Sequence, residues 1–276
     1  MPIPPQWAVL SPAMTSTTWK AKPRLLRWGL IALFWLLLWQ IGAWRLNQPL
    51  LLPSPLQVGR RLGELAATLP FWQSIAFSLR RIVAGFLLGF FSAALLAVAG
   101  FFLPPLASLL APPLAIIKST PVASFIVLAL LWLPSPWLSA FIAFLMVLPL
   151  CYENLLEGLK SADPLLLEMG KVYAFTPFQV FRYIYLPALI PYALAAVRTG
   201  LGFAWKAGIA GEVLAIPTGA MGTQLHTAKV TLETTDLFAW TAAIILLSLA
   251  LEKGAVALVK CLSRRYTPPK KEDMSC

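Results

Sequence analysis

Long apolar segments, separated by short polar stretches, dominate the pattern of this chain. A helix needs about 20 apolar residues to cross a bilayer, and six segments are candidates: 25–46, 76–102, 106–133, 137–152, 191–216 and 237–262. Their pattern predicts an all-α, polytopic transmembrane helix bundle of about six spans. An even number of spans places both chain ends on the same side of the membrane.

The third segment is interrupted twice. Pro112 and Pro113 come first, and the run Lys-Ser-Thr-Pro starting at Lys118 follows. Proline lacks an amide donor, so we expect both places to break the helix. Counted from residue 106, Lys118 stands roughly 18 Å along the span, near mid-bilayer. An ionisable residue at that depth indicates a cavity or a solute path, whereas a lysine that snorkels from a shorter, tilted helix is the alternative.

The fifth segment also carries charged residues. Lys206 and Glu212 are six residues apart, so they lie on different helix faces. Glycines in the same segment favour close helix contacts. With Lys118, these groups suit either a polar path or structural pairs between spans, and two lysines favour an anionic solute. The candidate lining of the path is Lys118, Ser119, Thr120, Pro121, Trp205, Lys206 and Glu212.

The stretches outside the spans complete the predicted organisation. Basic residues at both chain ends place both termini in the cytoplasm, although Arg60, Arg61, Arg80 and Arg81 in the first loop argue for the opposite orientation. A helical stripe predicts a surface helix over 56–69. The predicted divisions are a cytoplasmic segment 1–24, a transmembrane helix 25–46, an external loop 47–75, a core of five spans 76–262 and a basic cytoplasmic tail 263–276.

Composition supports the membrane class. Of 276 residues, 59% are hydrophobic and 12% are charged, with a mean hydropathy of +0.77, whereas soluble domains carry about 25% charged residues. The net charge of +11 does not indicate nucleic-acid binding, because the basic residues gather at the ends of apolar spans.

Sequence signatures of catalysis and of metal binding are absent. The three cysteines have no close spacing, so neither a disulfide framework nor a zinc site is expected. No phosphate-binding loop or nucleophile motif occurs, so we expect no enzymatic activity and no cofactor bound by this chain. His226 is interpreted as a loop or helix-end residue, with a ligand contact as the alternative. Glu153 and Glu157 are interpreted as a solvated helix face at the membrane edge.

The sequence of the polar stretch at 163–187 predicts two short helices joined by a turn. Asp163 suits a helix N-cap and Pro164 the first helical position, which predicts a helix over 163–175. Pro177 ends or kinks that helix, and a second short helix follows over 178–185. Aromatic residues are frequent here, as in interface cores. We therefore expect a helix–turn–helix that docks on a partner.

The spacing within this stretch resembles the coupling loop of permease subunits of bacterial ABC importers. That loop reads E-A-A, three residues, G, nine residues, I-x-L-P. Here the same spacing is filled by Glu168, Met169, Gly170, Ala174, Ile184, Leu186 and Pro187. Met169 and Gly170 replace two alanines. Ala174 replaces the glycine, so either alanine adopts the left-handed turn at a cost or the turn differs.

Further motifs extend the resemblance over roughly residues 51–260. "LLPSP", "SLRRIVAGF", "DPLLLE" and "VRTGLGFAWKAGIAGEVLA" occur in order. They are similar to the nitrate/sulfonate/bicarbonate, or taurine-type, branch of these permeases.

The resemblance implies a type I importer fold, with the loop as coupling helix and Glu168 at the contact with a separate cytoplasmic ATPase. It implies a homodimer in the bacterial inner membrane, in which the helix 25–46 is peripheral. ATP and Mg would be bound by the two ATPases, and an extracytoplasmic binding protein would deliver a small oxyanion such as sulfonate, nitrate or bicarbonate. The alternatives are a secondary carrier or channel working without ATP, which often shows an internal repeat, and a membrane enzyme.

Overall fold

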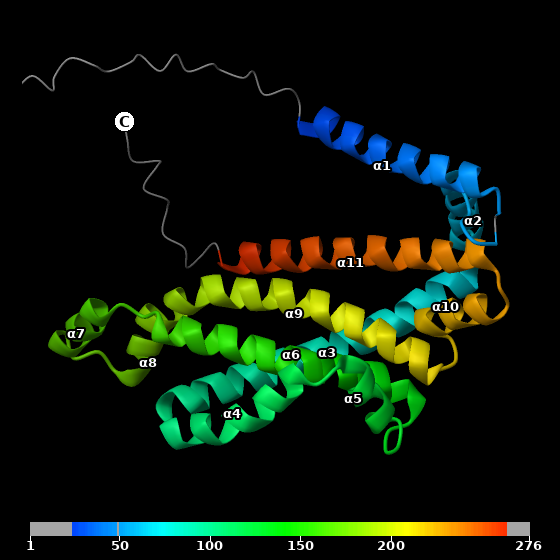
Figure 1. Cartoon of the computed structure of the whole chain (residues 1–276). Coiled ribbons are helices and arrows are strands. Elements are labelled where there is room, and N and C mark those ends of the chain that lie inside the picture. Colours follow the sequence, from blue (N-terminus) through cyan, green and yellow to red (C-terminus); the bar gives the residue numbers. More distant parts are fainter. Residues whose placement is uncertain (1–23, 49, 264–276) are drawn as a thin grey trace, which may run out of the picture.

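The computed structural model describes residues 24–48 and 50–263, which are almost entirely helical and contain no β-strand (Figure 1). Five helices are long and apolar enough to cross a membrane, and a bent pair makes a sixth candidate span. The all-α class and the number of spans are therefore confirmed. The predicted segment 1–24 and tail 263–276 lie, except for one residue each, outside the described residues.

The helices follow the chain in a simple order. They are α1 (Arg24–Leu46), α2 (Pro55–Ala66), α3 (Leu69–Phe102), α4 (Pro104–Ser119), α5 (Val122–Ala129) and α6 (Ser135–Lys160). After these come α7 (Pro164–Val172), α8 (Pro177–Val180), the π-helix η1 (Phe181–Tyr185), α9 (Leu186–Ala215), α10 (Met221–Val230) and α11 (Thr234–Ser263).

The centre of the bundle is α6, which packs along both α3 and α9. Glycines bring these helices together: a Cβ on Gly85 would lie 2.2 Å from the carbonyl oxygen of Ala140, and one on Gly208 would lie 2.6 Å from Ile82 Cγ1. Small residues are typical of close helix contacts in membranes, where no hydrophobic force drives helices together.

The outer helices are attached more loosely. In Figure 1, α11 runs beside α9, and α1 lies apart from the other long helices. Trp39 holds α1 at one end: its Nε1 donates to the Pro53 carbonyl at 3.1 Å, and its ring lies 5.9 Å from that of Phe238. Most α1 side chains stay exposed, as expected for a helix whose surroundings are lipid.

Two local expectations are wrong. Pro112 and Pro113 lie inside α4 without ending it, because prolines are tolerated in membrane helices whose neighbours compensate for the missing bonds. Arg80 and Arg81 belong to α3, which begins at Leu69. The Arg81 guanidinium carbon lies 4.0 Å from the centre of the Phe77 ring, and this cation–π contact lets the charge remain within the helix.

The second break in the third segment is present. Helix α4 ends at Ser119 and α5 begins at Val122, with 101° between them. Proline at 121 explains the position, since it restricts the backbone before it and donates no helical hydrogen bond.

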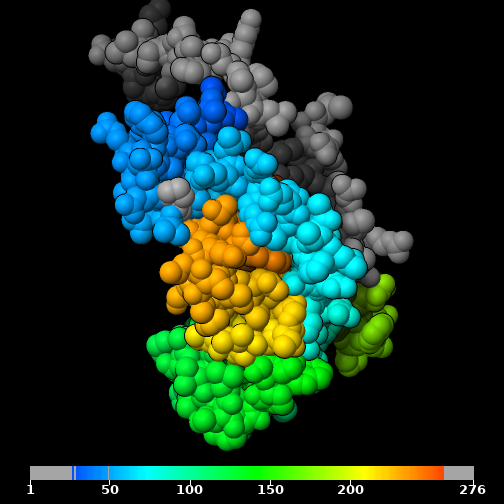
Figure 2. All heavy atoms as spheres, turned by 90° about the vertical axis from the view of Figure 1, so that its right-hand side faces the viewer, coloured from blue at the N-terminus to red at the C-terminus, as the bar shows by residue number. Residues whose placement is uncertain are grey.

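The two ends of the bundle differ. Helices α7 and α8 project from one end (the α7 end), whereas α10 and the start of α11 lie at the other (the α10 end) (Figure 1). Figure 2 shows the face at the α10 end, where the orange and yellow residues of α10 and the end of α9 lie between α2 and the green α5–α6 region.

Candidate solute path and coupling loop

The first helix of the coupling loop starts as the sequence predicts. Asp163 is the N-cap of α7, its side chain accepts a hydrogen bond from the Leu165 amide at 2.9 Å, and Pro164 occupies the first position. The carboxylate satisfies one amide that lacks an intrahelical partner. The predicted helix start is confirmed.

The backbone conformation at the end of α7 shows how alanine replaces glycine at position 174. This alanine has φ +53°, so it adopts the left-handed conformation itself. The Phe175 amide donates to Gly170 O at 2.8 Å, and the Ala174 amide donates to Lys171 O at 3.1 Å. These two bonds form a Schellman motif, the usual end of a helix before a left-handed residue.

The second arm of the loop folds back on the first. Thr176 and Gln179 form a capping box that starts α8, and η1 leads directly into α9 at Leu186 and Pro187. A Cβ on the buried Gly170 would lie 3.3 Å from Ile184 Cδ1, and Ile184 is itself buried. Gly170 and Ile184 therefore hold the two arms together.

The outer surface of the loop stays uncovered. Glu168 and Met169 are exposed on α7. The same loop exposes large apolar side chains with more than 60% of their surface accessible: Leu165, Val172, Tyr173, Phe178 and Tyr183. The loop thus exposes apolar side chains together with Glu168, and the coupling role of its residues remains a prediction.

Lys118 forms an ion pair that the sequence did not reveal. Its Nζ donates to both carboxylate oxygens of Glu153, at 2.7 and 2.8 Å. Glu153 stands roughly 10 Å along α6 from its end at Lys160, so Lys118 lies toward the α7 end of α6. Both side chains are half exposed and line a cavity of about 520 Å³ between α4 and α6.

The residues that follow Lys118 at the break donate hydrogen bonds to a backbone carbonyl group in the last turn of α4. The Ile116 carbonyl accepts hydrogen bonds from the Ser119 hydroxyl at 3.2 Å, and from the Thr120 hydroxyl and amide at 2.8 and 3.0 Å. Pro121 is exposed and precedes α5. Both hydroxyl groups are therefore used in hydrogen bonds to the last turn of α4 in this structure.

The two neighbours in α9 have opposite environments. Trp205 is only 2% exposed, and its Nε1 donates to the Ile244 carbonyl of α11 at 3.1 Å. Lys206 is exposed, on a face where a Cβ on Gly202 would meet nothing within 4 Å. Trp205 thus joins two helices, whereas Lys206 points away from the protomer.

Glu212 is fully buried at the α10 end of α9. Its Oε2 accepts hydrogen bonds from the Ser78 hydroxyl at 2.7 Å and from the Gly222 amide at 3.2 Å, and Ser78 Oγ accepts one from the Met221 amide at 2.9 Å. The first amides of α10 have no cap from their own helix. A carboxylate and a hydroxyl from two other helices replace it, as suits the positive end of a helix dipole.

The structure therefore divides the seven candidate path residues among three places. The region of Lys118 lies at the break between α4 and α5, Trp205 and Lys206 lie along α9, and Glu212 lies under α10. Whether they line a solute path remains a prediction.

Sequence reasoning missed Glu153 and Ser78. The sequence pattern predicts that Glu153 faces solvent, and no motif or spacing marks Ser78 as a polar contact between helices. Their partners are 35 and 134 residues away in the chain, beyond the reach of any helical period. Glu157 is exposed, as the sequence predicts, and among the described residues its ion-pair partner is Lys160 on its own helix, at 3.2 Å.

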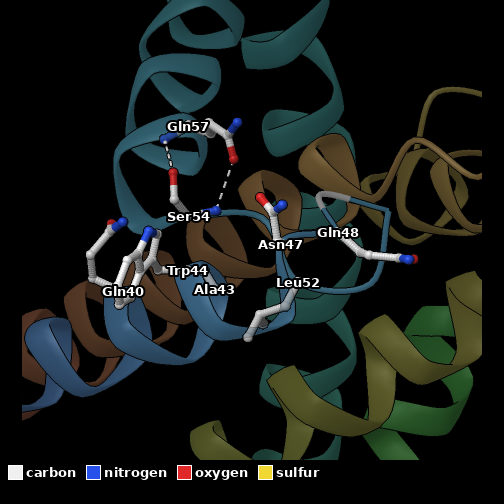
Figure 3. A pocket seen from close by; sticks show the side chains of 8 residues that line it. All are labelled: Gln40, Ala43, Trp44, Asn47, Gln48, Leu52, Ser54 and Gln57. Carbon is white, nitrogen blue, oxygen red and sulfur yellow. Dashed lines mark hydrogen bonds between the residues drawn. The ribbon is translucent and has the colours of Figure 1, made fainter.

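A second, smaller polar cavity of about 170 Å³ lies between the end of α1 and the start of α2 (Figure 3). Its side chains include Gln40, Trp44 and Asn47. Ser54 and Gln57 form the two hydrogen bonds of a capping box there. These two polar side chains of the cavity therefore cap the start of α2. His226 lies on α10, away from this cavity, and is partly exposed.

The bundle of candidate membrane spans with its projecting helical loop has the architecture expected of a transport permease subunit. The chain belongs to the family described as binding-protein-dependent transport system inner membrane component, whose model matches residues 75–268. It is accordingly a multi-pass inner membrane protein.

Curated relatives support the branch that the motifs indicated. The chain is 27% identical over 250 residues to the taurine transport system permease protein TauC of Escherichia coli (strain K12), covering 87% of this chain and 88% of that protein. It is 28% identical to the riboflavin transport system permease protein RibX of Chloroflexus aurantiacus, covering 83% and 86%. It is 25% identical to the putative aliphatic sulfonates transport permease protein SsuC of Bacillus subtilis, covering 73% and 74%. The resemblance to the taurine and sulfonate branch is thereby confirmed.

Proposed function

We propose that two copies of this chain form the solute pathway of an ATP-driven importer, and that α7 and α8 couple it to a separate ATPase. The observation that carries the proposal is the exposure of large apolar side chains on α7 and α8 together with that of Glu168. A helical loop that projects from one end of the bundle (Figure 1) suits insertion into a partner's groove.

The partners follow from this arrangement. Two cytoplasmic ATPases would bind ATP and Mg, and their closure would draw the two coupling loops together. The α7 end then faces the cytoplasm, together with both chain termini. The α10 end faces outward, where a solute-binding protein would dock. The exposed face of α9 with Lys206 and Gly202 is suited to the second copy, because lipid would not accept an exposed lysine cheaply.

The proposed solute is a small oxyanion. Relatives are named for taurine and for aliphatic sulfonates, and Lys118 and Lys206 supply cations within membrane-spanning parts of the chain. A sulfonate would gain charge-assisted hydrogen bonds from either ammonium group.

The decisive experiment is Glu168→Lys in the assembled transporter. Reversing this charge at the centre of the docking surface is expected to abolish ATP-driven uptake while the permease still inserts into the membrane. Uptake into proteoliposomes and ATP hydrolysis are measured together. Glu157→Lys is the matched control, since Glu157 is equally exposed near the same end but lies outside the loop, and it should transport normally. Normal uptake by Glu168→Lys would sink the proposal.

A further inference from the structure

The cavity between α4 and α6 contains a paired cation and anion. Lys118 contributes the ammonium group and Glu153 the carboxylate, and they meet through two hydrogen bonds of 2.7 and 2.8 Å. Half of each side chain remains exposed although the two are bonded. Both charges are therefore accessible from the cavity.

The cavity has room for a ligand beside the pair. Its volume is about 520 Å³, within the range of roughly 300–1,000 Å³ for small-molecule sites. Three alanines on α4, Ala107, Ala111 and Ala115, line it and leave space that larger side chains would fill. Tyr152 lies on the α6 side, next to Glu153 in the sequence.

Charge balance decides which solute suits this cavity. A simple anion that bound Lys118 would displace Glu153 and leave its carboxylate without a partner beside a second negative charge. A half-exposed carboxylate loses a modest amount of interaction free energy when its counter-charge is removed. A solute with an anionic group and an ammonium group replaces both halves of the pair, so that neither Lys118 nor Glu153 loses its counter-charge.

We infer that the Lys118–Glu153 pair is a binding site for a small zwitterion, whose oxyanion bonds Lys118 and whose ammonium bonds Glu153. This inference rests on the proposed function and narrows its solute from an oxyanion to an amino-substituted oxyanion. Glu153 then selects the zwitterion against the plain anion, because complementary charges at a site give specificity.

The test measures binding to the permease–ATPase complex in lipid nanodiscs, without ATP and without the solute-binding protein, so that only the membrane site selects. The probes are 2-aminoethanesulfonate, ethanesulfonate and ethylammonium, which carry both charges, the anion alone and the cation alone. Titration followed by saturation-transfer NMR gives the dissociation constants. The zwitterion is expected to bind about two- to fivefold more tightly than either singly charged probe, as the gain of one further half-exposed charge pair would give.

Variants separate ligand binding from a purely structural ion pair. Glu153→Gln should abolish the preference for the zwitterion over ethanesulfonate, and Lys118→Gln should weaken both sulfonates. The exchanged double variant Lys118→Glu/Glu153→Lys keeps one charge of each sign and should retain the preference. The control is Lys160→Gln/Glu157→Gln, an ion pair on α6 outside the cavity, which should change nothing.

Three results would overturn the inference: no saturable binding of the zwitterion, equal binding of the zwitterion and ethanesulfonate, or an unchanged ratio in Glu153→Gln. If the ion pair only connects α4 to α6, the single variants would have a lower melting temperature. Their affinity ratio for the zwitterion over ethanesulfonate would stay unchanged. The affinity ratio is measured without ATP. A ratio that contradicts the inference therefore does not count against ATP-driven transport by this chain. Failure of coupling in the Glu168 experiment, conversely, does not alter the ratio.

Discussion

Ala174 occupies a backbone conformation that ordinarily belongs to glycine. Its φ of +53° places its Cβ near the following carbonyl group, a conformation that costs an L-residue roughly 1–2 kcal/mol. The Schellman bonds of Phe175 and Ala174 to the preceding turn hold it there. The loop therefore keeps its bend, at an energetic cost, without the glycine that the family pattern has at this position.

Ala174→Gly should raise the stability of the permease by about 1 kcal/mol at most, because relief of the strain exceeds the entropy that glycine loses on folding. A thermal unfolding curve in detergent measures the change. Ala210→Gly is the control: Ala210 is exposed within helical α9, so the same substitution should cost about 1 kcal/mol there. A lower melting temperature for Ala174→Gly would contradict the structure of this turn.

Helix contacts in the core depend on the absence of side chains. A Cβ on Gly85 would lie 2.2 Å from the carbonyl oxygen of Ala140 and 2.9 Å from its carbon. These are backbone atoms, so no side-chain rotation can relieve the clash. Gly202 on α9 differs, since a Cβ there meets no described atom within 4 Å.

Gly85→Ala should therefore separate α3 from α6 and destabilise the protomer by roughly 1–3 kcal/mol or more. Gly202→Ala should instead raise protomer stability by up to about 1 kcal/mol, because alanine is favoured over glycine within a helix and its Cβ meets no described atom within 4 Å. Melting temperatures of the two variants, compared in the same detergent, check the difference. Equal destabilisation by both substitutions would contradict the assigned rotation of α9.

Across the whole molecule, the surface helix α2 packs against α11, and the contacts between these two helices include an ion pair between distant parts of the chain. Arg61 donates from Nε to Asp236 Oδ1 at 2.5 Å and from Nη2 to Oδ2 at 2.9 Å. The hydrogen bonds with Asp236, and then with Glu64, raise the pKa of Arg61 above its usual value. The start of α11 is thereby linked to α2.

Arg61→Ala should loosen the packing of α2 on α11 and increase amide hydrogen exchange in α2, with a loss of about 1 kcal/mol or less because the pair is partly exposed. Arg60→Ala is the matched control, since Arg60 is largely exposed and its ion-pair partner in the described part of the chain is Glu64 on its own helix, at 3.4 Å. Exchange mass spectrometry compares the two. Equal protection of α2 in both variants would show that the Asp236 contact does not hold it.

Local patterns in the sequence predict the membrane spans and the start of the coupling loop, but not α10 or the π-helix η1. Apolar segments of bilayer length predicted the spans, Asp163 and Pro164 predicted the start of α7, and proline at 121 predicted the break after α4. Each of these signals acts within one or two helical turns, so it can be recognised without knowing the neighbours. The two prolines inside α4 show the limit, because neighbouring helices decide whether a missing hydrogen bond ends a membrane helix.

The polar contacts between helices could not be found in this way. Glu153 looks the same in sequence whether it faces water or Lys118, and Ser78 has no feature that points to Glu212. These pairs depend on how each helix is rotated and how α4 bends at residue 120, and both are set by packing of side chains that are distant in the chain. Charged residues and helices follow from the amino-acid order, whereas the pairing of those charges arises only when the helices pack.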